Sequence, residues 1–166
     1  MTSAATPVPT QREPELAGQT VILIGGSAGI GFETARRARA EGADIILTGR
    51  DPGRLKQAAE ELGAPRTAAF DANDAAAMKR FFEDLPAPID HVMLTAGAPI
   101  YGPLLEMDSA QVREALSDHV VLGLEVARNA VGKKRPGGTL LLMGGTGGRR
   151  RACAGRAAPG RRGGDH

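Results

Sequence analysis

Residues 22–35, ILIGGSAGIGFETA, decide the fold that we expect for this chain. An apolar run leads into Gly25, Gly29 and Gly31, and a helix-like stretch follows at once. In a strand, turn and helix of this kind, the first glycine allows a tight exit from the strand, and the others let backbone approach a pyrophosphate and let the helix pack closely. The stretch therefore predicts a turn that can hold the phosphates of a dinucleotide. A glycine turn without any ligand is the alternative.

The rest of the chain alternates apolar runs with segments of helical period. Expected strands cover residues 19–26, 43–50, 66–72, 90–97 and 137–145, and expected helices cover residues 29–42, 51–63, 73–85 and 108–131. The runs VILI, IILT, VMLT and TLLLM are continuously apolar, which is typical of parallel strands buried on both faces. This order predicts an α/β fold with a doubly wound parallel sheet of about five strands.

Composition narrows the class of protein. The 166 residues are 42% hydrophobic and 24% charged, as in an ordinary globular domain, and only 3% are aromatic, which disfavours a surface that stacks on nucleic-acid bases. A single cysteine, Cys153, excludes an internal disulfide, and neither a membrane span nor metal-ligand spacing is evident. We expect a cytoplasmic protein without a membrane partner.

Charge and composition divide the chain into three parts. Residues 1–15 are rich in proline and predict a disordered leader, and residues 16–148 form the predicted domain. The last 18 residues carry six arginines and one acidic residue, Asp165. The rest of the chain is therefore slightly acidic, although the net charge of the whole chain is +2. Residues 149–166 therefore predict a disordered tail rich in arginine and glycine.

Residues 16–31, LAGQTVILIGGSAGIG, resemble the opening of the short-chain dehydrogenase/reductase family. The family fingerprint is Thr-Gly-x-x-x-Gly-x-Gly, and Ile24 stands here where the family has threonine. The resemblance extends to Asp71 in FDAND, to LTAG ending at Gly97, where the family has Asn-Asn-Ala-Gly, and to the fifth strand, TLLLMGG. It implies a Rossmann-type fold with strand order 3-2-1-4-5, and hydride transfer between a nicotinamide cofactor and a carbonyl or alcohol. The cofactor-binding residues that it implies, with Arg50 added below, are Gly25, Ser27, Ala28, Gly29, Ile30, Gly31, Arg50, Asp71, Ala96 and Gly97.

The end of the second strand, LTGRD, bears on the choice of cofactor. An acidic residue there would bind a ribose 2′-hydroxyl, whereas an arginine accommodates a 2′-phosphate. Gly49 followed by Arg50 therefore predicts NADP over NAD. The alternative is that Arg50 is a solvated loop charge and that Asp51 discourages the phosphate.

The catalytic residues that the resemblance implies are absent. The family uses a Tyr-x-x-x-Lys pair after the fifth strand, but the one tyrosine is Tyr101, and Leu105 stands four residues on. Thr146 falls where the family has a serine, and His119 where it has an asparagine. A loop threonine and a helix-surface histidine are the alternative interpretations, since a histidine alone specifies no chemistry.

After Gly148 the resemblance stops, and 15 of the last 18 residues are Arg, Ala, Gly or Pro. We therefore expect a truncated or frameshifted reductase that is catalytically incomplete. Two other functions stay open: a module that binds NADP without catalysis, and a tail that contacts nucleic acid through its charge. The elements that would cover the fifth strand and the fourth helix in the family are missing from this sequence. We therefore expect self-association or aggregation through these two elements. Nothing in the sequence specifies a substrate.

Overall fold

A five-stranded parallel sheet forms the centre of the computed structural model, which describes residues 15–63, 66–85, 88–97, 100, 102–103 and 105–144. Almost all of the predicted leader, Tyr101, Thr146 and the predicted tail lie outside these residues. The sheet order is β3-β2-β1-β4-β5, as the sequence predicted. The strands are β1 (Thr20–Ile24), β2 (Asp44–Gly49), β3 (Arg66–Ala69), β4 (Ile89–Leu94) and β5 (Lys134–Leu142).

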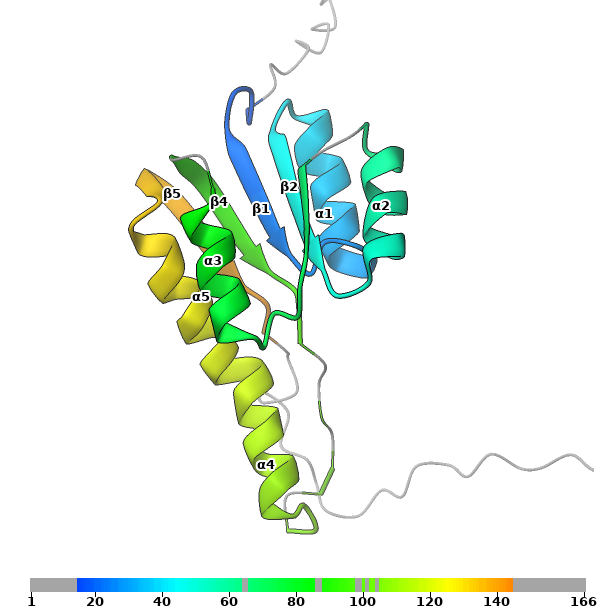
Figure 1. Cartoon of the computed structure of the whole chain (residues 1–166), viewed down its shortest axis with the longest axis vertical. Helices are drawn as coiled ribbons and strands as arrows, with labels where there is room; N and C mark the ends of the chain where they lie inside the picture. Colours follow the sequence, from blue (N-terminus) through cyan, green and yellow to red (C-terminus); the bar gives the residue numbers. More distant parts are fainter. Residues whose placement is uncertain are drawn as a thin grey trace, which may run out of the picture.

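Helices cover both faces of the sheet (Figure 1). They are α1 (Gly29–Ala40), α2 (Pro52–Glu61), α3 (Ala75–Glu83), α4 (Ser109–Leu116) and α5 (Leu122–Val131). A π-helical segment, η1 (Ser117–Val121), joins α4 to α5, so the predicted fourth helix is continuous but contains an irregular turn. In Figure 1, α4 lies beyond the carboxyl ends of the strands, and it has no buried residue.

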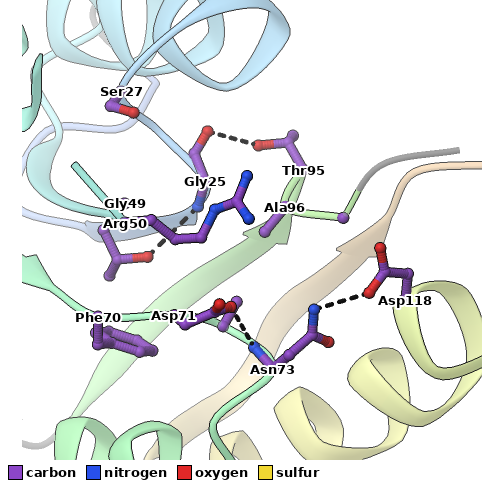
Figure 2. A pocket seen from close by; sticks show the side chains of 13 residues that line it. Gly25, Ser27, Gly49, Arg50, Phe70, Asp71, Asn73, Thr95, Ala96 and Asp118 are labelled. Atoms are coloured by element: carbon purple, nitrogen blue, oxygen red, sulfur yellow. Dashed lines mark hydrogen bonds between the residues drawn. The ribbon is translucent and has the colours of Figure 1, made fainter. Parts of the chain in front are cut away.

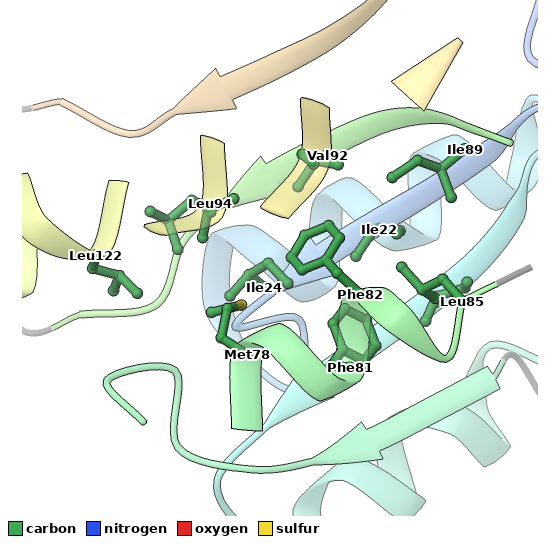
Figure 3. Close-up of a cluster of buried hydrophobic side chains, with 13 residues drawn as sticks. Ile22, Ile24, Met78, Phe81, Phe82, Leu85, Ile89, Val92, Leu94 and Leu122 are labelled. Atoms are coloured by element: carbon green, nitrogen blue, oxygen red, sulfur yellow. The ribbon is translucent and has the colours of Figure 1, made fainter. Parts of the chain in front are cut away.

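Two apolar cores lie on the two faces of the sheet. One lies between the sheet and α1 and α2, and includes Leu23, Leu47 and Leu55. The other lies between the sheet and α3 and α5, where Phe82 and Ile22 are buried among the side chains drawn in Figure 3. Because β1 and β2 are buried on both faces, their continuous apolar runs are explained.

The observed helix ends lie within two residues of the predicted ones, and local capping residues explain where they lie. Asp51 caps α2 by accepting a hydrogen bond from the Arg54 amide at 3.0 Å, and Asp108 caps α4 in a capping box with Gln111. Gly42 and Gly63 follow α1 and α2 with φ values of +87° and +78°, a conformation that favours glycine. These local signals fix where the chain leaves each helix for the next strand.

The prediction that TLLLM is buried on both faces is wrong. Leu141 is 48% exposed and Leu142 55% exposed. The reason is that β5 lies at the edge of the described sheet, paired with β4 alone, and that α5 covers one face only in part. An apolar run shows that a strand can be buried on both faces. The position of the strand in the sheet decides how much of it is buried.

Among the residues that the structure describes, no helix combines the length and the apolar character needed to cross a bilayer.

Candidate dinucleotide-binding site

The glycine turn lies between the end of β1 and the start of α1, at the carboxyl edge of the sheet. Gly25 has a φ of +98°, and a Cβ built on it would lie 2.5 Å from the Ala96 amide nitrogen. A Cβ on Gly31 would lie 2.5 Å from the Gly25 carbonyl oxygen, and Gly29 has a φ of +55°. The three glycines are therefore needed for conformation or for close approach, as their spacing predicted.

Two threonines from the strands on either side of β1 hold this turn. The Thr48 hydroxyl accepts a hydrogen bond from the Gly25 amide at 3.4 Å, and the Thr95 hydroxyl donates to the Gly25 carbonyl at 3.0 Å. Thr48 is 2% exposed, so its hydroxyl lies in the packed interior. Sequence reasoning missed both residues. The available signal was a threonine near the carboxyl end of each strand that neighbours β1.

The first turn of α1 has no side-chain cap. Ala28 occupies the N-cap position in an extended conformation, and no side chain accepts a hydrogen bond from the amides that follow. The first amides of a helix lack intrahelical partners, and the helix dipole adds positive potential there. Together with the glycine turn, this end of α1 can bind an anionic group such as a pyrophosphate.

Two adjoining clefts lie in front of the turn and share Gly25, Thr95, Ala96, Gly97 and Asp118. The first cleft has a volume of about 220 Å³ and extends along the ends of β2 and β3 (Figure 2). The second has a volume of about 520 Å³ and extends toward the end of β5. Each of the ten predicted cofactor-binding residues lines at least one of the two clefts.

The first cleft contains the predicted residues that carry charge. Arg50 and Asp71 line it with Ser27, and Gly49 leaves room for the Ser27 hydroxyl, which would lie 2.9 Å from a Cβ at that position. Asp51 is not part of this lining, because its carboxylate caps α2 instead. The hydrogen bond from the Arg54 amide lowers the pKa of Asp51 below its usual value.

A hydrogen-bonded pair that the sequence did not indicate closes one side of the first cleft. The Asn73 side-chain amide donates to the Asp118 carboxylate at 2.7 Å, and the Asn73 backbone amide donates to the Asp71 carboxylate at 3.0 Å. Figure 2 shows these residues side by side at the carboxyl end of the sheet. Asn73 and Asp118 are 45 residues apart, and no local pattern joins them.

The second cleft contains the one described catalytic candidate. His119 is exposed and lines this cleft together with apolar groups of Ile30, Leu142 and Met143. Thr146 and Tyr101 lie outside the described residues, so the structure does not place them. Within the described part of the chain, no group of three or more His, Cys, Asp or Glu side chains is arranged to hold a metal ion.

Comparison with known proteins agrees with this fold. The model of the family described as short chain dehydrogenase matches residues 19–151, and the chain belongs to this family of dehydrogenases and reductases. The Cyclic-di-GMP-binding biofilm dispersal mediator protein of Escherichia coli (strain K12) is 30% identical over 143 residues, covering 85% of this chain and 59% of that protein.

Solved structures share the arrangement. The crystal structure of BdcA in complex with NADPH matches with a TM-score of 0.73 and 26% identity, covering 84% of this chain and 57% of that one. The citronellol catabolism dehydrogenase AtuB of Pseudomonas aeruginosa PAO1 matches with a TM-score of 0.67 and 30% identity, covering 75% and 54%. The chain therefore spans little more than half the length of these relatives.

Proposed function

We propose that this chain binds NADP(H) along the two clefts, as the cofactor-binding part of an oxidoreductase. The observation that carries the proposal is the glycine turn, which contributes Gly25 to both clefts and presents the uncapped end of α1 to the second cleft. Arg50 and Ser27 line the first cleft and supply groups that suit a 2′-phosphate. The NADPH complex of BdcA supports the same choice, because that structure shares this fold.

We propose further that hydride transfer to or from a carbonyl or alcohol is the reaction of the intact relatives, and that this chain is catalytically incomplete. In such a reaction the carbonyl oxygen of the substrate would need a proton, while a bound NADPH would supply the hydride. The sequence contains no Tyr-x-x-x-Lys pair to provide this proton. His119 is a candidate proton donor, because it lines the second cleft and an imidazolium group can donate a proton.

Thermal unfolding with increasing NADPH or NADH tests cofactor choice. At about 100 times its dissociation constant, a ligand stabilises the folded state by roughly 2.7 kcal/mol, which corresponds to several degrees for a domain of this size. We expect NADPH to raise the midpoint far more than NADH. Arg50→Ala should abolish this difference, because the proposal assigns the 2′-phosphate to the Arg50 guanidinium, which lines the first cleft.

The matched control is Arg54→Ala, since Arg54 is an exposed arginine of α2 that does not line either cleft. It should leave the NADPH shift unchanged. Equal shifts with NADH and NADPH would contradict the 2′-phosphate assignment, and no shift with either would contradict cofactor binding. Binding of NADPH without turnover of any carbonyl substrate would favour a non-catalytic module.

We also propose that the chain self-associates through β5 and through the continuous helix formed by α4, η1 and α5. Leu141 is 48% exposed on the edge strand, and Leu116 and Leu124 are 52% and 57% exposed on the helix. Size-exclusion chromatography with light scattering should show dimers or larger species, and Leu141→Lys should reduce them. Leu105→Lys is the control, because Leu105 is 98% exposed and lies outside both elements. A monomeric wild-type chain would contradict the proposal.

The lone cysteine supports a cytoplasmic location, which we propose with the same function.

A further inference from the structure

We propose that the Asn73–Asp118 hydrogen bond is a positioning pair for the adenosine half of the dinucleotide. This inference rests on the proposed function. The two side chains come from the loop between β3 and α3 and from η1, and both line the first cleft (Figure 2). The distance of 2.7 Å is typical of a hydrogen bond to a charged acceptor, which is about twice as strong as one between neutral groups.

Each member of the pair is also tied to a predicted cofactor-binding residue. The Asn73 backbone amide donates to the Asp71 carboxylate at 3.0 Å. On the other side, a Cβ built on Gly97 would lie 2.9 Å from the Asp118 carbonyl oxygen, so η1 packs directly against Gly97. These contacts therefore cross the first cleft from the end of β3 to the end of β4. They connect Asp71 to Asn73, Asn73 to Asp118, and Asp118 to Gly97.

The π-helical turn gives independent support. A π-helical turn contains one residue more than an α-helical turn and is often found at functional sites. Packing in the core does not account for it here, because neither α4 nor η1 has a buried residue. The turn instead places Asp118 within hydrogen-bonding distance of Asn73 and places His119 at the second cleft. An irregular turn that has no buried residue and that contributes residues to both clefts fits a role in the site.

The pair fixes the width of the first cleft. The hydrogen bond limits how far η1 can move from the loop that carries Asp71. Arg50, to which we assign the 2′-phosphate, lines the same cleft, so the adenosine half of a bound dinucleotide would lie against this wall. Because coupling is reciprocal, a ligand that binds better when the bridge is formed also strengthens the bridge.

A double-mutant cycle tests the pair, with adenosine 2′,5′-bisphosphate as the probe and NADPH as the complete ligand. Asn73→Ala and Asp118→Ala should each raise the Kd of the probe by about three- to tenfold, and the double variant should be no weaker than the weaker single variant. Asp118→Asn should restore most of the affinity, because it keeps an acceptor oxygen for Asn73. Asp118→Leu should not restore it.

Two measurements separate positioning from a merely structural role. The coupling between the two substitutions must be present in the Kd. The unfolding midpoint without ligand should change little, because Asn73 is exposed and Asp118 is only half-buried. Asn129→Ala is the control, since its side chain also donates one hydrogen bond, at 2.8 Å to the Glu125 carbonyl, but does not line either cleft.

If the two single substitutions had additive effects on the Kd, or if they were coupled only in the unfolding midpoint, the positioning role of the pair would be overturned. The proposed function would remain intact in that case, provided that the wild-type protein bound NADPH. Wild-type protein that bound neither NADPH nor the probe would overturn both.

Discussion

Gly25→Ala is expected to abolish cofactor binding and to destabilise the fold by about 3 kcal/mol or more. The φ of +98° is unfavourable for alanine, and the new Cβ would lie 2.5 Å from the backbone nitrogen of Ala96. The Ala96 backbone cannot move aside as a flexible side chain can, because its amide donates a hydrogen bond to the Ile24 carbonyl at 2.9 Å. Equilibrium urea unfolding measures the loss of stability, and titration with NADPH should show a Kd raised at least about a hundredfold.

Two other glycines provide matched controls for this result. Gly29→Ala, at φ +55° with no atom within 4 Å of the new Cβ, should cost only about 1 kcal/mol. Gly132→Ala, at φ −78° and equally open, should change stability by less than about 0.5 kcal/mol. If Gly25→Ala behaved like Gly132→Ala, the close approach of the turn to β4 would be refuted.

Phe82→Ala should be the most damaging core substitution, with a loss of about 3–5 kcal/mol in the free energy of unfolding. Phe82 is 1% exposed, and its ring packs edge-on against Phe81 with ring centroids 5.3 Å apart. Because domains of this size are stable by only about 5–15 kcal/mol, the variant should lose a large part of its stability. Urea unfolding followed by circular dichroism measures the change.

Val131→Ala is the control for this prediction, because Val131 is 76% exposed at the end of α5. It should cost less than about 0.5 kcal/mol. A loss below about 1 kcal/mol for Phe82→Ala would show that α3 is not packed against the sheet as the structure describes.

The sheet order and the ends of α1, α2 and α4 could be predicted because their signals are local. Continuous apolar runs identified β1, β2 and β4, and Asp51 and Gly42 marked helix ends by their own hydrogen bonding and backbone freedom. The fingerprint glycines were predictable for the same reason. Their spacing is a direct result of turn geometry, which requires no knowledge of the rest of the fold.

The rest depended on contacts between distant parts of the chain. Thr48 and Thr95 become partners of Gly25 only when β2 and β4 flank β1, and Asn73 meets Asp118 only after the complete sheet has formed. The π-helical turn has no signature in apolar periodicity. The exposure of Leu141 depends on what covers β5, and the composition of the strand does not encode this.

The absence of buried residues in α4 has a consequence for the entropy of binding. The first two turns of this helix can open locally without disturbing either core, so their amide hydrogens should exchange with solvent far faster than those of β1. The Asn73–Asp118 pair lies at the boundary between this locally opening segment and the stable sheet. A dinucleotide that stabilised the Asn73–Asp118 hydrogen bond would therefore reduce the conformational freedom of α4. The affinity of the dinucleotide would then include the entropic cost of ordering a helix that the dinucleotide does not contact.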